Sequence, residues 1–246
     1  MDKTRRNFMK DAGVLTAGVV TVSLASKDAA AETRDTGGDP SKRWAMVVDL
    51  RKCIACQACS VACIMENKVP YDNFRTIVST YEVKDGDKVG IFMLPRLCNH
   101  CEEPACIPVC PVGATYQKKD GIVVVDNTRC VGCGYCVQAC PYDARFINPK
   151  TRTADKCTFC THRLEAGLLP ACVETCVGGA RVIGDIKDPN SEASKLLATN
   201  EVKVLRPEMN TQPHVYYIGL DSRFQGKVGG EEALWRPGRD HEESLR

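Results

Sequence analysis

The sequence predicts an α+β protein built from short β-hairpins and few short helices around four groups of four cysteines. Three observations predict this class. Asp-Gly turns separate short runs of β-prone residues, one short segment carries helix-capping residues, and 16 cysteines recur at regular spacing among 246 residues. Asp-Gly between such runs favours a tight hairpin turn. The regular cysteine spacing indicates that a prosthetic group, and not apolar burial alone, organises the chain.

Residues 1–31 carry the three successive parts of a twin-arginine export signal. Arg5 and Arg6 are adjacent, an apolar stretch covers residues 12–25, and three alanines end at Ala31. This order is typical of a removable signal peptide, with cleavage expected after Ala31. The alternative is a basic terminus in which the arginine pair arose by chance. We expect a periplasmic protein, peripheral to the inner membrane.

Residues 32–43 are polar and rich in turn residues, which predicts a linker. The cysteine groups follow it. The first and third have x2, x2, x3 spacing and lie 77 residues apart, while the second and fourth lengthen only the middle gap. The groups are Cys53, Cys56, Cys59, Cys63; Cys98, Cys101, Cys106, Cys110; Cys130, Cys133, Cys136, Cys140; and Cys157, Cys160, Cys172, Cys176.

This spacing favours iron–sulfur clusters. Three thiolates on one tight loop can surround a single cubane, while the fourth cysteine points toward a second cluster. Sixteen cysteines match the ligands that four [4Fe-4S] clusters need. Zinc knuckles and disulfides are alternatives, but zinc pairs are usually further apart, and a disulfide framework has no reason to repeat this spacing.

His100, between Cys98 and Cys101, is an alternative cluster ligand. Because the cysteine set is complete, we expect His100 either to form a hydrogen bond near a sulfur or to lie in solvent.

Between and after the cysteine groups, the pattern predicts short elements. These are hairpins formed by residues 77–83 with 89–94 and by 115–117 with 122–125, a helix at 191–197 capped by Asn190 or Ser191, a strand at 214–220, and a polar tail at 226–246.

The charge balance argues against nucleic-acid binding, and the apolar runs are too short for a membrane span. The chain has 33 Lys and Arg against 31 Asp and Glu, so no basic field favours nucleic acid. No run approaches the roughly 20 apolar residues of a membrane span.

Since each oxidised cluster with its thiolates carries a formal charge of about −2, nearby amides, lysines and arginines or partner subunits must balance the charge of the clusters.

Three stretches of sequence resemble one known family. They are Lys-Cys-Thr-Phe-Cys-Thr-His-Arg at 156–163, Leu-Pro-Ala-Cys-Val-Glu at 169–174, and Val-Gly-Cys-Gly-Tyr-Cys at 131–136. These stretches resemble the four-cluster electron-transfer subunits of the dimethyl-sulfoxide-reductase family of molybdoenzymes. The resemblance covers essentially the whole chain. It implies two interleaved ferredoxin-like 2[4Fe-4S] units.

The resemblance also implies which cysteines share a cluster and where the units lie. The four ligand sets are Cys53, Cys56, Cys59 with Cys176; Cys157, Cys160, Cys172 with Cys63; Cys98, Cys101, Cys106 with Cys140; and Cys130, Cys133, Cys136 with Cys110. Residues 44–94 and 150–185 then form the two halves of an outer unit, 95–149 an inner unit, and 186–246 a C-terminal extension and partner-contacting tail.

The function that the resemblance implies is non-catalytic. Such a subunit relays electrons from a membrane quinol-oxidising anchor subunit to a catalytic subunit holding the molybdenum cofactor, with tetrathionate as the expected acceptor. Polysulfide, thiosulfate, dimethyl sulfoxide or a role in formate-dependent nitrite reduction are alternatives within the family. A free-standing soluble polyferredoxin is an alternative of another class. A catalytic iron–sulfur enzyme would need an open iron site, and the complete cysteine set argues against one.

Overall fold

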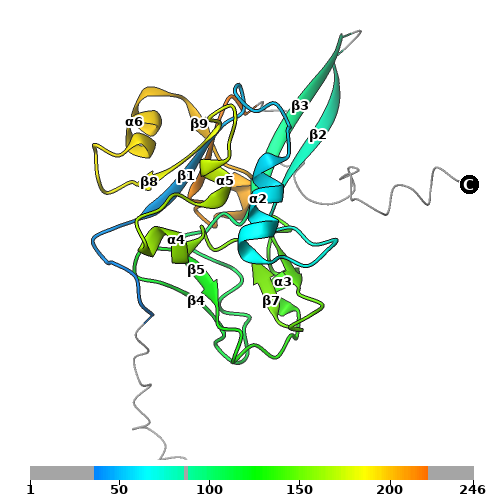
Figure 1. The fold of residues 1–246 in the computed structure, drawn as a ribbon, viewed down its shortest axis with the longest axis vertical. Coiled ribbons are helices and arrows are strands. Elements are labelled where there is room, and N and C mark those ends of the chain that lie inside the picture. Colours follow the sequence, from blue (N-terminus) through cyan, green and yellow to red (C-terminus); the bar gives the residue numbers. More distant parts are fainter. Residues whose placement is uncertain (1–35, 86–87, 221–246) are drawn as a thin grey trace, which may run out of the picture. The chain divides into compact units, whose positions relative to one another are not determined.

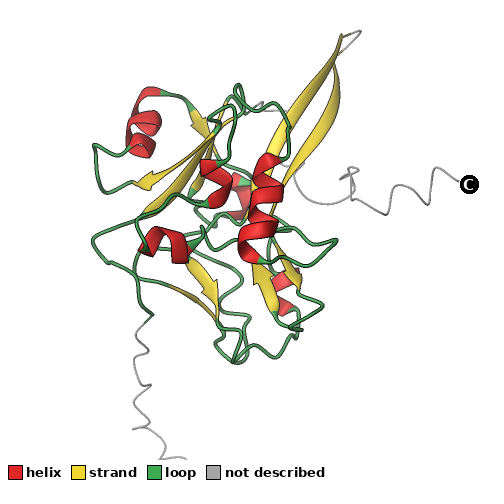
Figure 2. Cartoon of the chain, viewed as in Figure 1, coloured by secondary structure: helices red, strands yellow, loops and turns green. Residues whose placement is uncertain are grey.

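The computed structural model describes residues 36–85 and 88–220. The expected signal at 1–31 and the tail at 226–246 therefore lie outside the described residues. Small sheets and short helices joined by long loops make up the described chain (Figures 1 and 2). The elements are β1 Trp44–Asp49, α2 Ala58–Asn67, β2 Thr76–Asp85, β3 Lys88–Leu97, β4 Thr115–Gln117, β5 Val123–Val125, α3 Tyr135–Gln138, β6 Arg145–Ile147, β7 Ala154–Lys156, α4 Thr161–Glu165, α5 Ala171–Glu174, β8 Arg181–Asp185, α6 Glu192–Thr199, β9 Val202–Lys203, a 3-10 turn Pro207–Met209, and β10 Val215–Ile218.

The largest sheet has four strands in the order β8-β1-β10-β9. Strand β1 pairs antiparallel with β8 and parallel with β10. Its residues 45–48 are fully buried. Strand β1 precedes the first cysteine group and β8 follows the last one, so the sheet brings both ends of the cysteine-containing region together.

The two faces of β1 have different neighbours. Met46 and Val48 belong to the large core that also contains buried cysteines. Val47, which points to the other face because side chains alternate along a strand, packs with Ala193 of α6 and Ile218 of β10. Helix α6 therefore covers the face of the sheet that is turned away from the cysteines.

Helix α6 confirms the predicted helix and identifies its cap. The Ser194 N–H donates to the Ser191 Oγ at 3.1 Å, which satisfies one of the free amides at the helix start. The helix lies very close to β8: a Cβ on Gly184 would be 2.7 Å from the Ala193 Cβ. Gly184 therefore permits the contact between α6 and the sheet.

Both predicted hairpins and the late strand are confirmed. The hairpin of β2 and β3 is longer than expected and pairs Thr76 with Leu97 at its open end. The hairpin of β4 and β5 pairs Thr115 with Val125. The described chain thus has few helices, small sheets and a mixed α and β composition, as the sequence predicts.

Gly37, in the predicted linker, and Trp44, the first residue of β1, form backbone hydrogen bonds with the β4–β5 turn. The Lys119 N–H donates to the Gly37 O at 2.9 Å, and the Trp44 N–H donates to the Asp120 O at 3.2 Å. No helix in the described residues has the length and apolar character needed to cross a membrane. The domain boundaries given above stay predictions.

Candidate functional site

All sixteen cysteines lie in the described part of the chain, and all are free thiols. Most are buried or half-buried, whereas Cys56 and Cys133 are exposed. These two exposed residues occupy the same position in the first and third groups, which have identical spacing. The first and third groups therefore share both their spacing and an exposed second cysteine.

The four groups share one backbone turn. In each group the residue directly before the second cysteine has a positive φ: Ala55 at 55°, His100 at 43°, Gly132 at 68° and Phe159 at 51°. Only glycine adopts this conformation without steric cost, so three of the four turns are strained. The common turn shows that the shared C-x2-C spacing encodes a common loop.

The first and third groups are preceded by equivalent hydrogen bonds. The Asp49 N–H donates to the Ala180 O at 2.8 Å, and the Asp126 N–H donates to the Ala114 O at 2.8 Å. Ala180 and Ala114 lie four residues after Cys176 and Cys110. Each bond therefore joins the start of one three-cysteine loop to the segment that follows a cysteine of another group.

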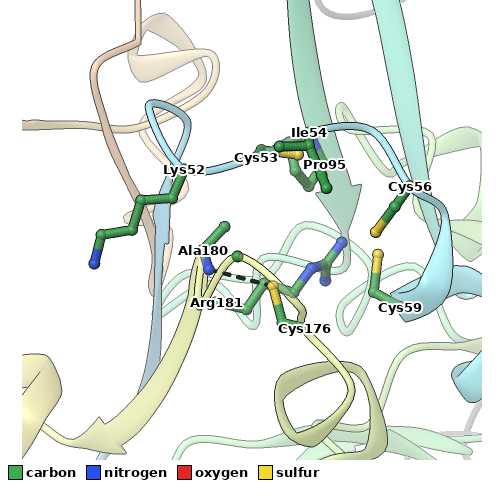
Figure 3. A pocket seen from close by; sticks show the side chains of 10 residues that line it. Lys52, Cys53, Ile54, Cys56, Cys59, Pro95, Cys176, Ala180 and Arg181 are labelled. Atoms are coloured by element: carbon green, nitrogen blue, oxygen red, sulfur yellow. Dashed lines mark hydrogen bonds between the residues drawn. The ribbon is translucent and has the colours of Figure 1, made fainter.

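One cavity lies at the first group. Cys53, Cys56, Cys59 and Cys176 line it, together with Arg181. Figure 3 shows the sulfurs of Cys56 and Cys59 turned toward each other, with the Arg181 side chain extending toward them. The structure thus places a cysteine of the fourth group beside three of the first.

A close backbone approach supports this cavity. A Cβ on Gly178 would lie 2.4 Å from the Lys52 O, so only glycine lets the segment after Cys176 pass the start of the first group.

A second set of sulfurs includes Cys63 from the first group. Burial and then the nearby charges of Cys172 and Cys160 raise the pKa of Cys63 to about 12. Burial also raises the pKa of Cys157, and the charges of Cys63 and Cys172 add to this effect. These four cysteines therefore lie close to one another.

A third set lies around Cys101. Burial and then the charge of Cys98 raise the pKa of Cys101 to about 12, with further contributions from Cys106 and Cys140. Thiols with such pKa values are protonated at neutral pH. Metal binding to them must release protons, because the ligand is the thiolate.

Backbone amides face sulfur at the last cysteine of two groups. The Ala114 N–H donates to the Cys110 Sγ at 3.2 Å, and the Ala180 N–H donates to the Cys176 Sγ at 3.2 Å. Burial raises the pKa of Cys110, but the amides of Thr115, Val112 and Ala114 outweigh it, so the net pKa is lowered. Donors of this kind stabilise negative charge on sulfur.

Asn67 occupies the equivalent position after Cys63 in the first group. Its Nδ2 lies 3.5 Å from the Cys63 Sγ and 3.6 Å from the Cys160 Sγ, and it also donates to the Cys63 O at 3.1 Å. A side-chain amide therefore takes the place of the alanine amide in this group and reaches two sulfurs.

His100 is buried, so the expectation that its ring could lie in solvent is wrong. It is 1% exposed, and its ring packs on Phe159 with centroids 3.8 Å apart. The Val123 N–H donates to the His100 Nδ1 at 3.0 Å. The Nδ1 of His100 thus accepts a hydrogen bond from the backbone of β5.

Three buried cations are residues that the cysteine pattern does not reveal. Arg145, Lys156 and Arg181 are each at most 4% exposed. Two of them have a signal in the sequence: Arg145 and Arg181 each lie five residues after the last cysteine of a group. Comparing the groups beyond their final cysteine would have identified these two.

Comparisons with known proteins relate the chain to iron–sulfur proteins. The family described as a 4Fe-4S dicluster domain matches residues 89–186. The chain is 57% identical to the B subunit of tetrathionate reductase from Salmonella typhimurium, over 96% of this chain and 97% of that protein. It is 43% identical to the B subunit of tetrathionate reductase from Archaeoglobus fulgidus, over 74% of this chain and 89% of that protein.

A third relative acts in another reductase. The chain is 39% identical to the B subunit of selenate reductase from Mesobacillus selenatarsenatis, over 72% of each chain. The 4Fe-4S match makes iron–sulfur clusters, rather than zinc or disulfides, the reason for the cysteines. The chain therefore belongs to the family of iron–sulfur subunits of reductases that includes the tetrathionate reductase B subunits and is related to the dimethyl-sulfoxide-reductase family.

Proposed function

We propose that this chain is a non-catalytic electron-transfer subunit with four [4Fe-4S] clusters, in two interleaved ferredoxin-like units. It relays electrons from a membrane quinol-oxidising subunit to a molybdenum-cofactor subunit that reduces tetrathionate. The observation that carries this proposal is the 57% identity to the B subunit of a tetrathionate reductase over nearly the full length of both chains.

The proximity of cysteines from different groups supports the proposed ligand sets. Cys176 shares a cavity with the first group. Cys63 lies near Cys160 and Cys172. Cys140 lies near Cys98 and Cys101.

The fourth set, Cys130, Cys133, Cys136 and Cys110, is supported by the repeat. The bond from the Asp126 N–H to the Ala114 O matches the bond from the Asp49 N–H to the Ala180 O. Ala180 accompanies Cys176 at the first group, so the equivalent bond to Ala114 supports Cys110 as the fourth ligand at the third group.

The surroundings of the sulfurs fit iron–sulfur clusters. Thiolate sulfur is the ligand that these clusters take, and their function is to accept and release single electrons. Arg181 Nη1 is buried beside the cavity lined by cysteines and has no hydrogen-bond partner among the described residues. An unpaired buried cation is costly, and an anionic group in the cavity removes that cost.

The protein's own residues have three tasks in this function. The cysteine loops hold the clusters, the amides of Ala114, Ala180 and Asn67 stabilise charge on sulfur, and the core excludes water from the buried sulfurs. Residues 1–31 direct export by the twin-arginine route, which places the working protein in the periplasm.

The test is anaerobic co-expression of the full chain with the catalytic subunit and the anchor subunit of a tetrathionate reductase. We expect the chain to co-purify with a molybdenum-containing subunit, to contain about sixteen iron atoms per chain for four cubanes, and to support quinol-driven tetrathionate reduction. Isolation of the chain alone would instead indicate a soluble polyferredoxin. Reduction of selenate but not tetrathionate by the same complex would overturn the acceptor and leave the electron-transfer function intact.

A further inference from the structure

Arg145, Lys156 and Arg181 are buried cations without a carboxylate partner in the described residues. Their side chains donate to sulfur, to threonine hydroxyls and to backbone carbonyls. A buried charge is costly unless an opposite charge or several hydrogen bonds compensate it. Cysteines of the proposed ligand sets lie beside Arg145 and Arg181, and Lys156 adjoins Cys157 in the chain.

Arg181 lies between two sets of cysteines. Its side chain extends into the cavity of Cys56 and Cys59 (Figure 3). Its Nη2 donates to the Thr76 Oγ1 at 2.9 Å, and its Nη1 has no hydrogen-bond partner in residues 36–85 and 88–220. Burial lowers the pKa of Arg181, but the charges of Cys172 and Cys59 outweigh it and raise the pKa. Cys59 and Cys172 belong to different sets, so Arg181 faces both.

Arg145 has the equivalent position in the other unit. Its Nη2 donates to the Cys106 Sγ at 2.9 Å, and its Nη1 donates to the Thr115 Oγ1 at 3.3 Å. Burial lowers its pKa, but the charges of Cys106, Cys98 and then Cys136 outweigh this effect. Cys106 and Cys136 belong to different sets.

The two arginines are related by the internal repeat. Each lies five residues after the last cysteine of a group, and each is anchored by a threonine hydroxyl. A repeated position with a repeated anchor makes a chance burial of these two charges a poor explanation.

Lys156 lies between the two units. Its Nζ donates to the Cys157 O at 2.8 Å and to the Val123 O. The Val123 N–H in turn donates to the Nδ1 of His100, which stands between Cys98 and Cys101. Lys156 therefore lies against Cys157 of one unit and, through Val123 and His100, beside the Cys98–Cys101 loop of the other.

The three cations therefore alternate with the four sets of cysteines. From the first set, the order is Cys53, Cys56, Cys59, Cys176; Arg181; Cys63, Cys157, Cys160, Cys172; Lys156; Cys98, Cys101, Cys106, Cys140; Arg145; Cys110, Cys130, Cys133, Cys136.

The geometry points to Arg181, Lys156 and Arg145 as fixed positive charges, each shared by two neighbouring clusters, that raise the reduction potentials of both. This inference rests on the proposed function, since it requires that the clusters are present. A cation favours the reduced cluster because reduction adds a negative charge. A charge placed between two anions also reduces their mutual repulsion, which otherwise makes it harder to reduce one cluster beside a reduced neighbour.

The test uses variants that remove the charge and variants that keep it. R181Q, K156Q and R145Q remove it; R181K, K156R and R145K keep it. Iron content is measured first, and redox titration followed by electron paramagnetic resonance then gives the potentials of the full-length protein with its accompanying subunits.

We expect an overlapping pattern among four midpoint potentials. R181Q lowers two of them, R145Q lowers the other two, and K156Q lowers one from each pair. Each shift corresponds to at least a tenfold change in the reduction equilibrium, which is about 59 mV for a one-electron couple. The charge-keeping variants retain potentials close to the wild-type values.

Arg43 offers a matched control. It is a largely buried arginine, but it pairs with Glu102 and bonds to His214, and no cysteine charge acts on it. We expect R43Q to leave all four potentials unchanged.

Three results would overturn the inference. The first is that the charge-removing variants contain their full iron but keep wild-type potentials. The second is that every variant shifts all four potentials by the same amount. The third concerns variants that do not load iron: loss of iron in both R181Q and R181K would show that the charge is not the important property. Absence of clusters from the wild-type protein would refute the proposed function instead.

Discussion

The Arg75 guanidinium donates to the Asn67 Oδ1 at 2.8 Å and thereby orients the Asn67 amide. With its oxygen engaged, the amide turns its nitrogen toward the sulfurs of Cys63 and Cys160. Arg75 is in turn paired with Asp155, with 2.8 Å between Nε and Oδ1. The Arg75–Asp155 ion pair thus holds the Asn67 amide so that its nitrogen faces the two sulfurs.

Replacement of Asn67 by alanine should lower the potential of the cluster that Cys63 and Cys160 share. Hydrogen bonds to sulfur favour the reduced, more negative state, so their loss favours oxidation. We expect a change of up to about tenfold in the reduction equilibrium, or about 59 mV, measured by redox titration. The control is Asn73→Ala, because the Asn73 Nδ2 donates to the Tyr71 O instead of a sulfur. An equal shift in both variants would contradict this role of Asn67.

Cys133→Ser should delete or convert one cluster. Cys133 is exposed, so the substitution removes a proposed ligand without opening a cavity in the core. We expect lower iron content and loss of quinol-driven reduction, whereas an artificial dye that reduces the catalytic subunit directly should still support turnover. Unchanged quinol-linked activity in this variant would argue against electron transfer through the third cysteine group.

Two glycines in the third cysteine loop should differ in their tolerance of alanine. At Gly132, φ is +68° and a Cβ would lie 2.2 Å from the Arg152 O. At Gly134, φ is +80°, but no atom of the described chain lies within 4 Å of where a Cβ would stand. Gly134→Ala should cost about 1 kcal/mol from backbone strain alone, and Gly132→Ala should cost clearly more. Thermal unfolding and iron retention measure the difference, and equal losses would refute the close contact with Arg152.

Acidification should destabilise the protein partly through His214. Burial and then the charge of Arg43 lower the pKa of His214 from 6.5 to about 4. Between these values only the unfolded chain takes up the proton, so the stabilisation is complete above pH 6.5 and decreases as the pH falls toward 4. The loss amounts to about 1.4 kcal/mol for each pH unit in this window.

The His214 contribution can be isolated with His214→Gln. As the pH falls from 7.5 to 5.5, the melting temperature of this variant should rise relative to that of wild type, because only wild type loses the His214 contribution. Other acid-sensitive groups contribute equally to both proteins. A difference that does not change with pH would exclude His214 as a source of the acid sensitivity.

Local signals explain which elements could be predicted from the sequence. The β4–β5 hairpin was predictable because Asp120-Gly121 forms its turn, and α6 because Ser191 caps it. Helix α2 was not predicted, because the residues at its ends carry no signal: Gln57 forms no side-chain cap, and Lys68, not glycine, occupies the left-handed position at its end. The cysteines also hide its apolar pattern.

The cysteines of the site could be identified from the sequence, but their surroundings could not. Spacing reveals the loops, because a C-x2-C turn is local. The burial of Arg181 depends on Thr76, which is 105 residues away, and the orientation of Asn67 depends on Arg75 and Asp155. Such contacts exist only once the chain has folded.

Cys53 and Cys176 line the same cavity although they stand near opposite ends of the cysteine-containing region. During translation, a ribosome releases Cys53, Cys56 and Cys59 long before it adds Cys176. A prematurely terminated chain therefore lacks a wall of this cavity, however much of the protein has already been made. This site can therefore assemble only after translation has reached the start of β8.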